Sequence, residues 1–123
     1  MSIRSKYDSE LRVLFTFAEG LVTFEEVQKH LDEESRNGTL AYPEIADAIN
    51  AHTNLTGEQV RLVVKRLVDM NCTTTLGPTA IVSTSDVLYG MASMLAILSE
   101  LQDGPRIGVF RNFDEGLKWL LRS

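Results

Sequence analysis

The sequence lacks the features that mark secreted, membrane-bound and nucleic-acid-binding proteins. Its 123 residues include one cysteine, Cys72, so no disulfide can form within the chain. No apolar run approaches the roughly 20 residues that a membrane-spanning helix requires, and residues 1–10 lack the apolar core of a signal peptide. The net charge of −5, with acidic and basic residues mixed, argues against binding to nucleic acid or to an anionic membrane. A reducing cytoplasm is the expected compartment.

Catalytic motifs are missing as well. The sequence contains neither a glycine-rich phosphate-binding loop nor a G-x-S-x-G elbow around a nucleophilic serine. Its two histidines, His30 and His52, have no cysteine partner and no paired acidic residues at metal-ligand spacing. We place His30 at the margin of a helix and His52 in a solvated loop. The sequence therefore predicts a non-enzymatic protein without a cofactor or a bound metal.

The unit that the sequence does contain is a strand followed by a capped helix, and it is clearest over residues 79–101. Residues 79–82 form a short apolar run with β-branched side chains, which is typical of a buried strand. Residues 83–86, Ser-Thr-Ser-Asp, supply side-chain oxygens that cap the start of a helix. Apolar residues then recur at helical spacing until Gly104 and Pro105 end the helix.

The same unit recurs three more times. Each copy pairs a predicted strand with a cap sequence: 11–17 with Thr-Phe-Glu-Glu at 23–26, 44–49 with Thr-Gly-Glu-Gln at 56–59, and 107–110 with Asn-Phe-Asp-Glu at 112–115. Gly20 marks a turn after the first strand. The segment 44–49 is Ala-rich and compatible with a helix, but the neighbouring units favour a strand.

Strands that alternate with helices predict an α/β fold with parallel strands and right-handed crossovers. We expect a β/α superhelix of about four strand–helix units around a mostly parallel four-stranded sheet, as a single domain over residues 11–123. Residues 1–10 form either an arm or an extra edge strand. The helix starts then share the C-terminal edge of the sheet, where open α/β sheets bind ligands.

The predicted ligand or partner site lies along this edge, because helix N-termini present free N–H groups and partial positive charge. Its candidate residues come from the loop before the second helix and from the start of the third: His52, Thr53, Asn54, Thr56, Ser83, Thr84, Ser85 and Tyr89. For Thr56 and for the serine-rich cluster, helix capping is the simpler role.

The residue after Tyr89 is a glycine one turn into the predicted helix, and glycine there costs about 0.5–1 kcal/mol relative to alanine. Gly90 and the nearby Ala92, Ser93 and Ala96 give this helix a side of small residues. Close packing within the domain is the favoured explanation. A homodimer seam or a ligand contact is the alternative.

Two segments carry a resemblance to a known family. Residues 80–94 (A-I-V-S-T-S-D-V-L-Y-G-M-A-S-M) and 106–121 (R-I-G-V-F-R-N-F-D-E-G-L-K-W-L-L) resemble small bacterial STAS-like proteins, which are related to anti-sigma-factor antagonists. Regulatory members of that class are phosphorylated on a serine in an Asp-Ser-Ser-Gly motif. Here residues 54–57 are Asn-Leu-Thr-Gly, which leaves Thr53 or Thr56 as substitute acceptors.

Two functions are compatible with these observations. The resemblance implies a STAS-like regulatory module that binds an unidentified protein partner, or a second copy of itself, through the edge with the helix starts. The alternative is a small-molecule-binding domain for a lipophilic or anionic ligand, similar to lipid-transfer folds. In that case Leu88, Met91 and Met94 would form apolar walls around the ligand tail, and helix N-termini would face its head group.

Overall fold

A computed structural model describes residues 3–122, so residues 1 and 2 of the predicted N-terminal segment and Ser123 lie outside the described residues. The helices and strands follow the order β1 (Ile3–Asp8), β2 (Val13–Val22), α1 (Phe24–Asn37), β3 (Glu44–Thr53), α2 (Gly57–Thr73), β4 (Thr79–Val82), α3 (Asp86–Leu101), β5 (Ile107–Phe110) and α4 (Phe113–Arg122). The predicted alternation of strands and helices is confirmed.

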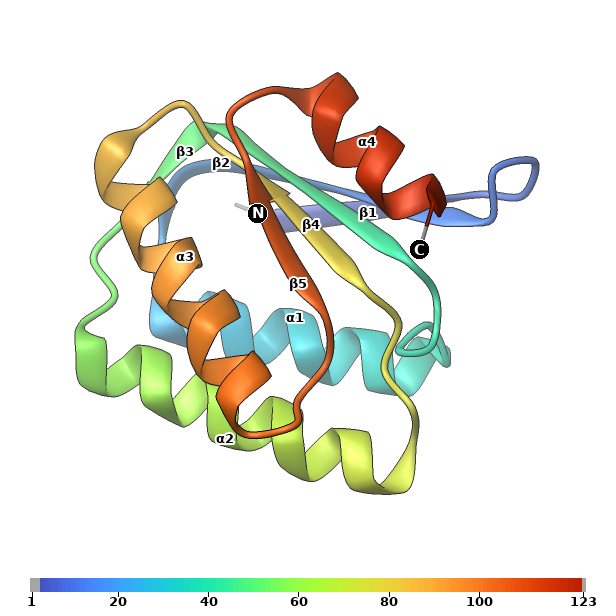
Figure 1. The fold of residues 1–123 in the computed structure, drawn as a ribbon, viewed down its shortest axis with the longest axis horizontal. Helices are drawn as coiled ribbons and strands as arrows, with labels where there is room; N and C mark the ends of the chain where they lie inside the picture. Colours follow the sequence, from blue (N-terminus) through green and yellow to red (C-terminus); the bar gives the residue numbers. More distant parts are fainter. Residues whose placement is uncertain (1–2, 123) are drawn as a thin grey trace.

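The strands form one five-stranded sheet in the order β1-β2-β3-β4-β5 (Figure 1). Strands β2 to β5 are parallel, and β1 pairs antiparallel with β2 at the edge. The α/β fold class is therefore confirmed, and the N-terminal segment contributes the extra edge strand rather than a free arm. Among residues 3–122, no helix combines the length and the apolar composition that crossing a bilayer demands.

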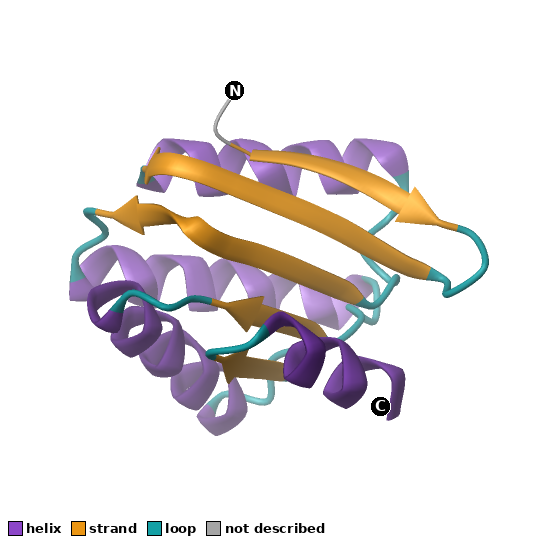
Figure 2. Ribbon diagram, turned by 90° about the horizontal axis from the view of Figure 1, so that it is seen from above, coloured by secondary structure: helices purple, strands orange, loops and turns teal. Residues whose placement is uncertain are grey.

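The two faces of the sheet are covered unequally. Helices α1, α2 and α3 pack on one face, and α4 alone packs on the other (Figures 1 and 2). Alternate residues of each strand point to opposite faces, so Ile45 and Val82 pack with Leu120 of α4, whereas Ala48 packs with Leu88 of α3. A third apolar cluster joins α1 to α2. The three-helix side is the thicker layer and holds the cavity described below.

The predicted caps form at every helix start. Thr23 and Thr56 make complete capping boxes with the residues three positions on, and Ser85 accepts a hydrogen bond from the Leu88 N–H. Asn112 likewise accepts from the Glu115 N–H through its side-chain oxygen. Each of these four helices follows a parallel strand, so all four starts lie at the C-terminal edge of the sheet, as predicted.

Three local predictions need correction. Gly20 is not in a turn: β2 continues to Val22 beyond a bulge in the pairing with β3, and Gly20 adopts a positive φ of 67° inside the strand. Strand β3 runs to Thr53, so His52 lies in a strand and not in a loop. At Gly90, an added Cβ would meet no atom within 4 Å. Close packing within the domain therefore does not explain this glycine.

Candidate functional site

The predicted site residues around the start of α3 are held in a compact network. Ser83 is fully buried, and its Oγ accepts a hydrogen bond from the Ser85 N–H. The Arg111 guanidinium lies 4.0 Å from the centre of the Tyr89 ring and donates to the carbonyl of Thr84 at 3.2 Å. Arg111 also forms an ion pair with Asp86 at 2.8 Å. These contacts fix the first turn of α3 against the loop that follows β5.

The predicted residues around the end of β3 have separate surroundings. His52 and Asn54 are exposed. The Thr53 hydroxyl donates to the carbonyl of Val22 at 2.9 Å and accepts from the Leu55 N–H, so it fastens the end of β3 to β2. Thr56 caps α2. Of these residues, only Thr53 also lines the interior cavity. Whether the edge binds a partner stays a prediction.

A cavity of about 230 Å³, partly open to solvent, lies between the sheet and the three helices α1, α2 and α3. Its walls are mostly aliphatic, with Ala46 from β3, Val63 from α2 and Leu95 from α3 as examples. Leu88 and Met91 line it as the sequence predicted for a ligand-binding domain, but Met94 does not belong to the lining. An engineered apolar cavity of about 150 Å³ holds benzene, so this space accommodates a somewhat larger apolar molecule.

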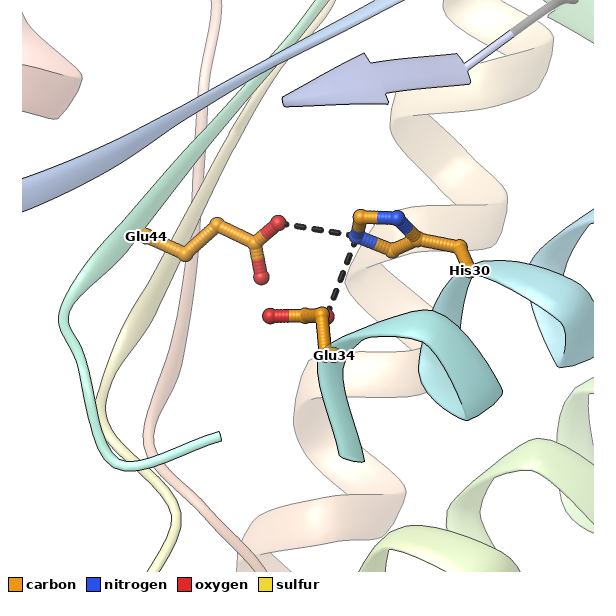
Figure 3. A group of neighbouring side chains, drawn as sticks. All are labelled: His30, Glu34 and Glu44. Atoms are coloured by element: carbon orange, nitrogen blue, oxygen red, sulfur yellow. Dashed lines mark hydrogen bonds and ion pairs between the residues drawn. The ribbon is translucent and has the colours of Figure 1, made fainter. Parts of the chain in front are cut away.

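A cluster of three ionisable side chains interrupts the apolar wall. His30 Nε2 lies 3.0 Å from Glu34 Oε1 and 2.9 Å from Glu44 Oε2. His30 and Glu34 come from successive turns of α1, and Glu44 is the first residue of β3, so both carboxylates meet the same ring nitrogen (Figure 3). This location is at the N-terminal edge of the sheet, opposite the helix starts. The prediction that His30 has no paired acidic residues at metal-ligand spacing is wrong.

Hydroxyl groups of the neighbouring strands hold the cluster in place. Thr16 of β2 donates its hydroxyl hydrogen to Glu44 Oε2. Because that hydrogen is committed, the Ser5 hydroxyl of β1 is the donor in its 2.7 Å contact with Thr16. A chain of hydrogen bonds therefore runs from the edge strand through β2 to the first residue of β3. No buried side-chain polar atom among the described residues is left without a partner.

Burial and mutual attraction determine the protonation of this cluster. Burial by itself would lower the pKa of His30, but hydrogen bonds and charge attraction from Glu34 and Glu44 raise that pKa from 6.5 to about 10. Burial also raises the pKa of Glu34, helped by the adjacent Glu44 and opposed by His30. At neutral pH His30 is therefore an imidazolium. No lysine or arginine lies among the described residues that line the cavity.

Part of this cluster was visible in the sequence. His30 and Glu34 are four residues apart, a spacing that places two side chains on one face of a helix. Glu44 gave no such signal, since a six-residue connection separates it from α1 and its position depends on the register of β3. The cluster is missed when His30 is considered without the acidic residue one helical turn away.

Comparison with solved structures identifies a protein of similar fold. The structure matches an uncharacterised protein of the DUF3478 family from Shewanella loihica PV-4, which has a SpoIIAA-like fold. The match has a TM-score of 0.59 and covers 96% of this chain and 91% of that chain, at 16% sequence identity. No protein-family model and no curated protein matches the sequence. The chain has a SpoIIAA-like, or STAS-like, α/β fold, which confirms the resemblance at the level of fold.

Proposed function

We propose that this protein is a binding module that holds an apolar small molecule between its sheet and helices α1, α2 and α3. The observation that carries the proposal is the cavity of about 230 Å³ with predominantly aliphatic walls. The cavity is concave, partly open to solvent and lined mainly by apolar side chains, which is the form that small-molecule sites usually take. Binding an apolar guest restores the dispersion contacts that the empty space lacks.

The lining also defines the chemistry of the guest. The cluster of His30, Glu34 and Glu44 places acidic and basic side chains in a wall that is mostly aliphatic, with a few threonines and Tyr42 as its other polar members. Ligand pockets commonly combine apolar walls with a few polar groups that fix orientation. The polar end of a guest is thus expected at the N-terminal edge of the sheet. The sequence had instead suggested a head group at the helix starts.

We test this function by calorimetric titration with 1-octanol as the probe. Ala46→Leu places a larger side chain in the cavity and is expected to weaken binding at least about tenfold, which corresponds to about 1.4 kcal/mol. Ala41→Leu is the matched control, because Ala41 is exposed in the loop before β3 and should leave the affinity unchanged. Absence of octanol binding to the unsubstituted protein, or equal binding by Ala46→Leu, would contradict the proposal.

Protein–protein interaction at the helix starts is a second candidate. It is favoured by Val87, whose side chain is 72% exposed in the first turn of α3. Val87 follows Asp86, which pairs with Arg111, and the Arg111 guanidinium also lies over the Tyr89 ring; we expect these contacts to restrict motion of the surface around Val87. Preorganised surfaces lose less conformational entropy on association.

This second function predicts that Val87→Asp abolishes capture of a partner from the source cell while octanol binding persists. The measurement is affinity capture with the substituted and unsubstituted proteins side by side. Leu62→Asp serves as the control, since Leu62 is also exposed but lies on α2. Equal recovery of the same partner by all three proteins would exclude an interface centred on Val87.

A further inference from the structure

We propose that His30, Glu34 and Glu44 form a binding site for one divalent transition-metal ion, with Zn²⁺ as the best fit. The inference is independent of the apolar guest proposed above. It rests on the convergence of one nitrogen and two oxygen atoms from two rigid elements. Each residue offers one ligand atom, and all three atoms lie within 4.8 Å of one another.

The distances suit a small metal ion. Ligand atoms at about 2.0–2.1 Å from a tetrahedral zinc ion lie about 3.3 Å from each other. His30 Nε2 lies 3.0 Å from one carboxylate oxygen and 2.9 Å from the other. Both contacts meet at His30 Nε2 (Figure 3), so an ion would sit between this nitrogen and the two carboxylate oxygens, with the side chains adjusting around it.

The supporting structure resembles that of a built metal site. The four-residue spacing of His30 and Glu34 places both on one face of α1, and Glu44 stands at the start of the long strand β3. Thr16 donates a hydrogen bond to Glu44 Oε2 and is itself held by Ser5. Hydrogen-bonded partners of this kind orient metal ligands and commonly contribute 10- to 100-fold, in order of magnitude, to metal affinity.

Charge favours a dication at this position. The side chains of His30, Glu34 and Glu44 are 16%, 9% and 10% exposed, so the cluster is largely removed from water. With a neutral imidazole, two ionised carboxylates carry a charge of −2, and the cavity wall offers no lysine or arginine to balance it. A divalent cation balances this charge. Buried charges are stable only when paired or bound to metal.

The donor set narrows the identity of the ion. An imidazole ligand suits Zn²⁺ and other transition metals, whereas Mg²⁺ and Ca²⁺ favour oxygen ligands alone. Three protein ligands leave the fourth tetrahedral position open, because no other described His, Cys, Asp or Glu joins the group. All three residues line the cavity, so the open position is adjacent to the space assigned to the apolar guest.

The test uses the full chain on a Cys72→Ser background, because Cys72 is an exposed thiol that could bind metal by itself. Titration with ZnCl₂ against a chromophoric chelator should give one tight site per chain. CoCl₂ should give the intense visible absorption of a four-coordinate cobalt ion. Glu44→Gln removes a ligand and is expected to weaken Zn²⁺ binding at least about 100-fold. This loss of affinity is at least as large as that caused by removing a residue that only orients a ligand.

His52→Gln is the matched control, because His52 is the other histidine of the chain and is exposed. It should leave the affinity and the cobalt spectrum unchanged. If Glu44→Gln fails to fold by circular dichroism, Thr16→Val removes only the supporting hydroxyl and should weaken binding about 10- to 100-fold. Absence of one-to-one binding by the starting protein, or unchanged affinity in the folded cluster variants, would overturn the proposal.

Discussion

Replacing His30 with alanine is expected to lower the free energy of unfolding by about 3 to 5 kcal/mol, measured by urea denaturation with a chelator present. The substitution removes the imidazolium that hydrogen-bonds Glu34 and Glu44, and it leaves two carboxylates together in a mostly apolar wall. Removing one partner of a buried charge cluster costs more than the interaction itself contributes, because the remaining charge stays desolvated.

Two further variants separate charge from packing. His52→Ala changes an exposed histidine and should alter the free energy of unfolding by no more than about 0.5 kcal/mol. Replacing His30, Glu34 and Glu44 together with leucine should recover most of the loss, since apolar side chains often replace buried ionic groups without penalty. A His30→Ala protein as stable as the His52→Ala protein would show that the cluster is hydrated and not buried.

The same comparison has a pH dependence of defined sign. The pKa of His30 is raised from 6.5 to about 10 in the folded protein, so folding favours the protonated ring. Its contribution to stability is complete below pH 6.5 and is lost progressively as the pH rises toward 10. The stability difference between the starting protein and His30→Ala should therefore shrink over this range.

Replacing Ile45 with alanine is expected to cost about 2 to 5 kcal/mol, again by urea denaturation. Ile45 is fully buried at the centre of the cluster that joins the sheet to α4. This side of the sheet has only one covering helix, so the void left by the deleted carbons has few neighbours that can move in to fill it. The measured slope with urea should stay unchanged, as expected for a loss of stability without a change of fold.

Ile49→Ala is the matched control on the same strand. Ile49 is 38% exposed and lies at the bulge in the pairing of β3 with β2. Its truncation should cost less than about 1 kcal/mol, near the centre of the distribution for ordinary substitutions. Equal costs at the two positions would show that α4 does not seal that face of the sheet.

Local signals in the sequence were sufficient to predict most of the fold. The T-x-x-E and T-x-x-Q boxes and the Ser85 cap gave the helix starts, because capping depends on residues within one turn. The strand at 44–49 is also confirmed, although its composition alone was ambiguous. The length of β2 was not predicted, since the strand continues beyond the register shift after Phe17 and through Gly20 by pairing with β3, which the local sequence does not indicate.

The candidate site was less predictable, because it depends on contacts between residues that are distant in the sequence and meet only in the folded sheet. Leu88 and Met91 were expected to line an apolar pocket, and they do. The cluster was missed because Glu44 reaches His30 only when β3 lies next to β2 in the observed register. The resemblance to STAS-like proteins also directed attention to the helix starts, whereas the ionisable cluster lies at the other end of the sheet.

The most direct measurement is a methyl-resolved NMR titration of the protein with toluene, an apolar probe small enough for the cavity. We predict saturable shifts at methyl groups that line the cavity, such as those of Val63 and Met91. Methyl groups of Val82 and Leu120, in the core under α4, should stay unchanged. Shifts confined to exposed methyl groups, or none at saturating toluene, would contradict an interior binding site between the sheet and helices α1, α2 and α3.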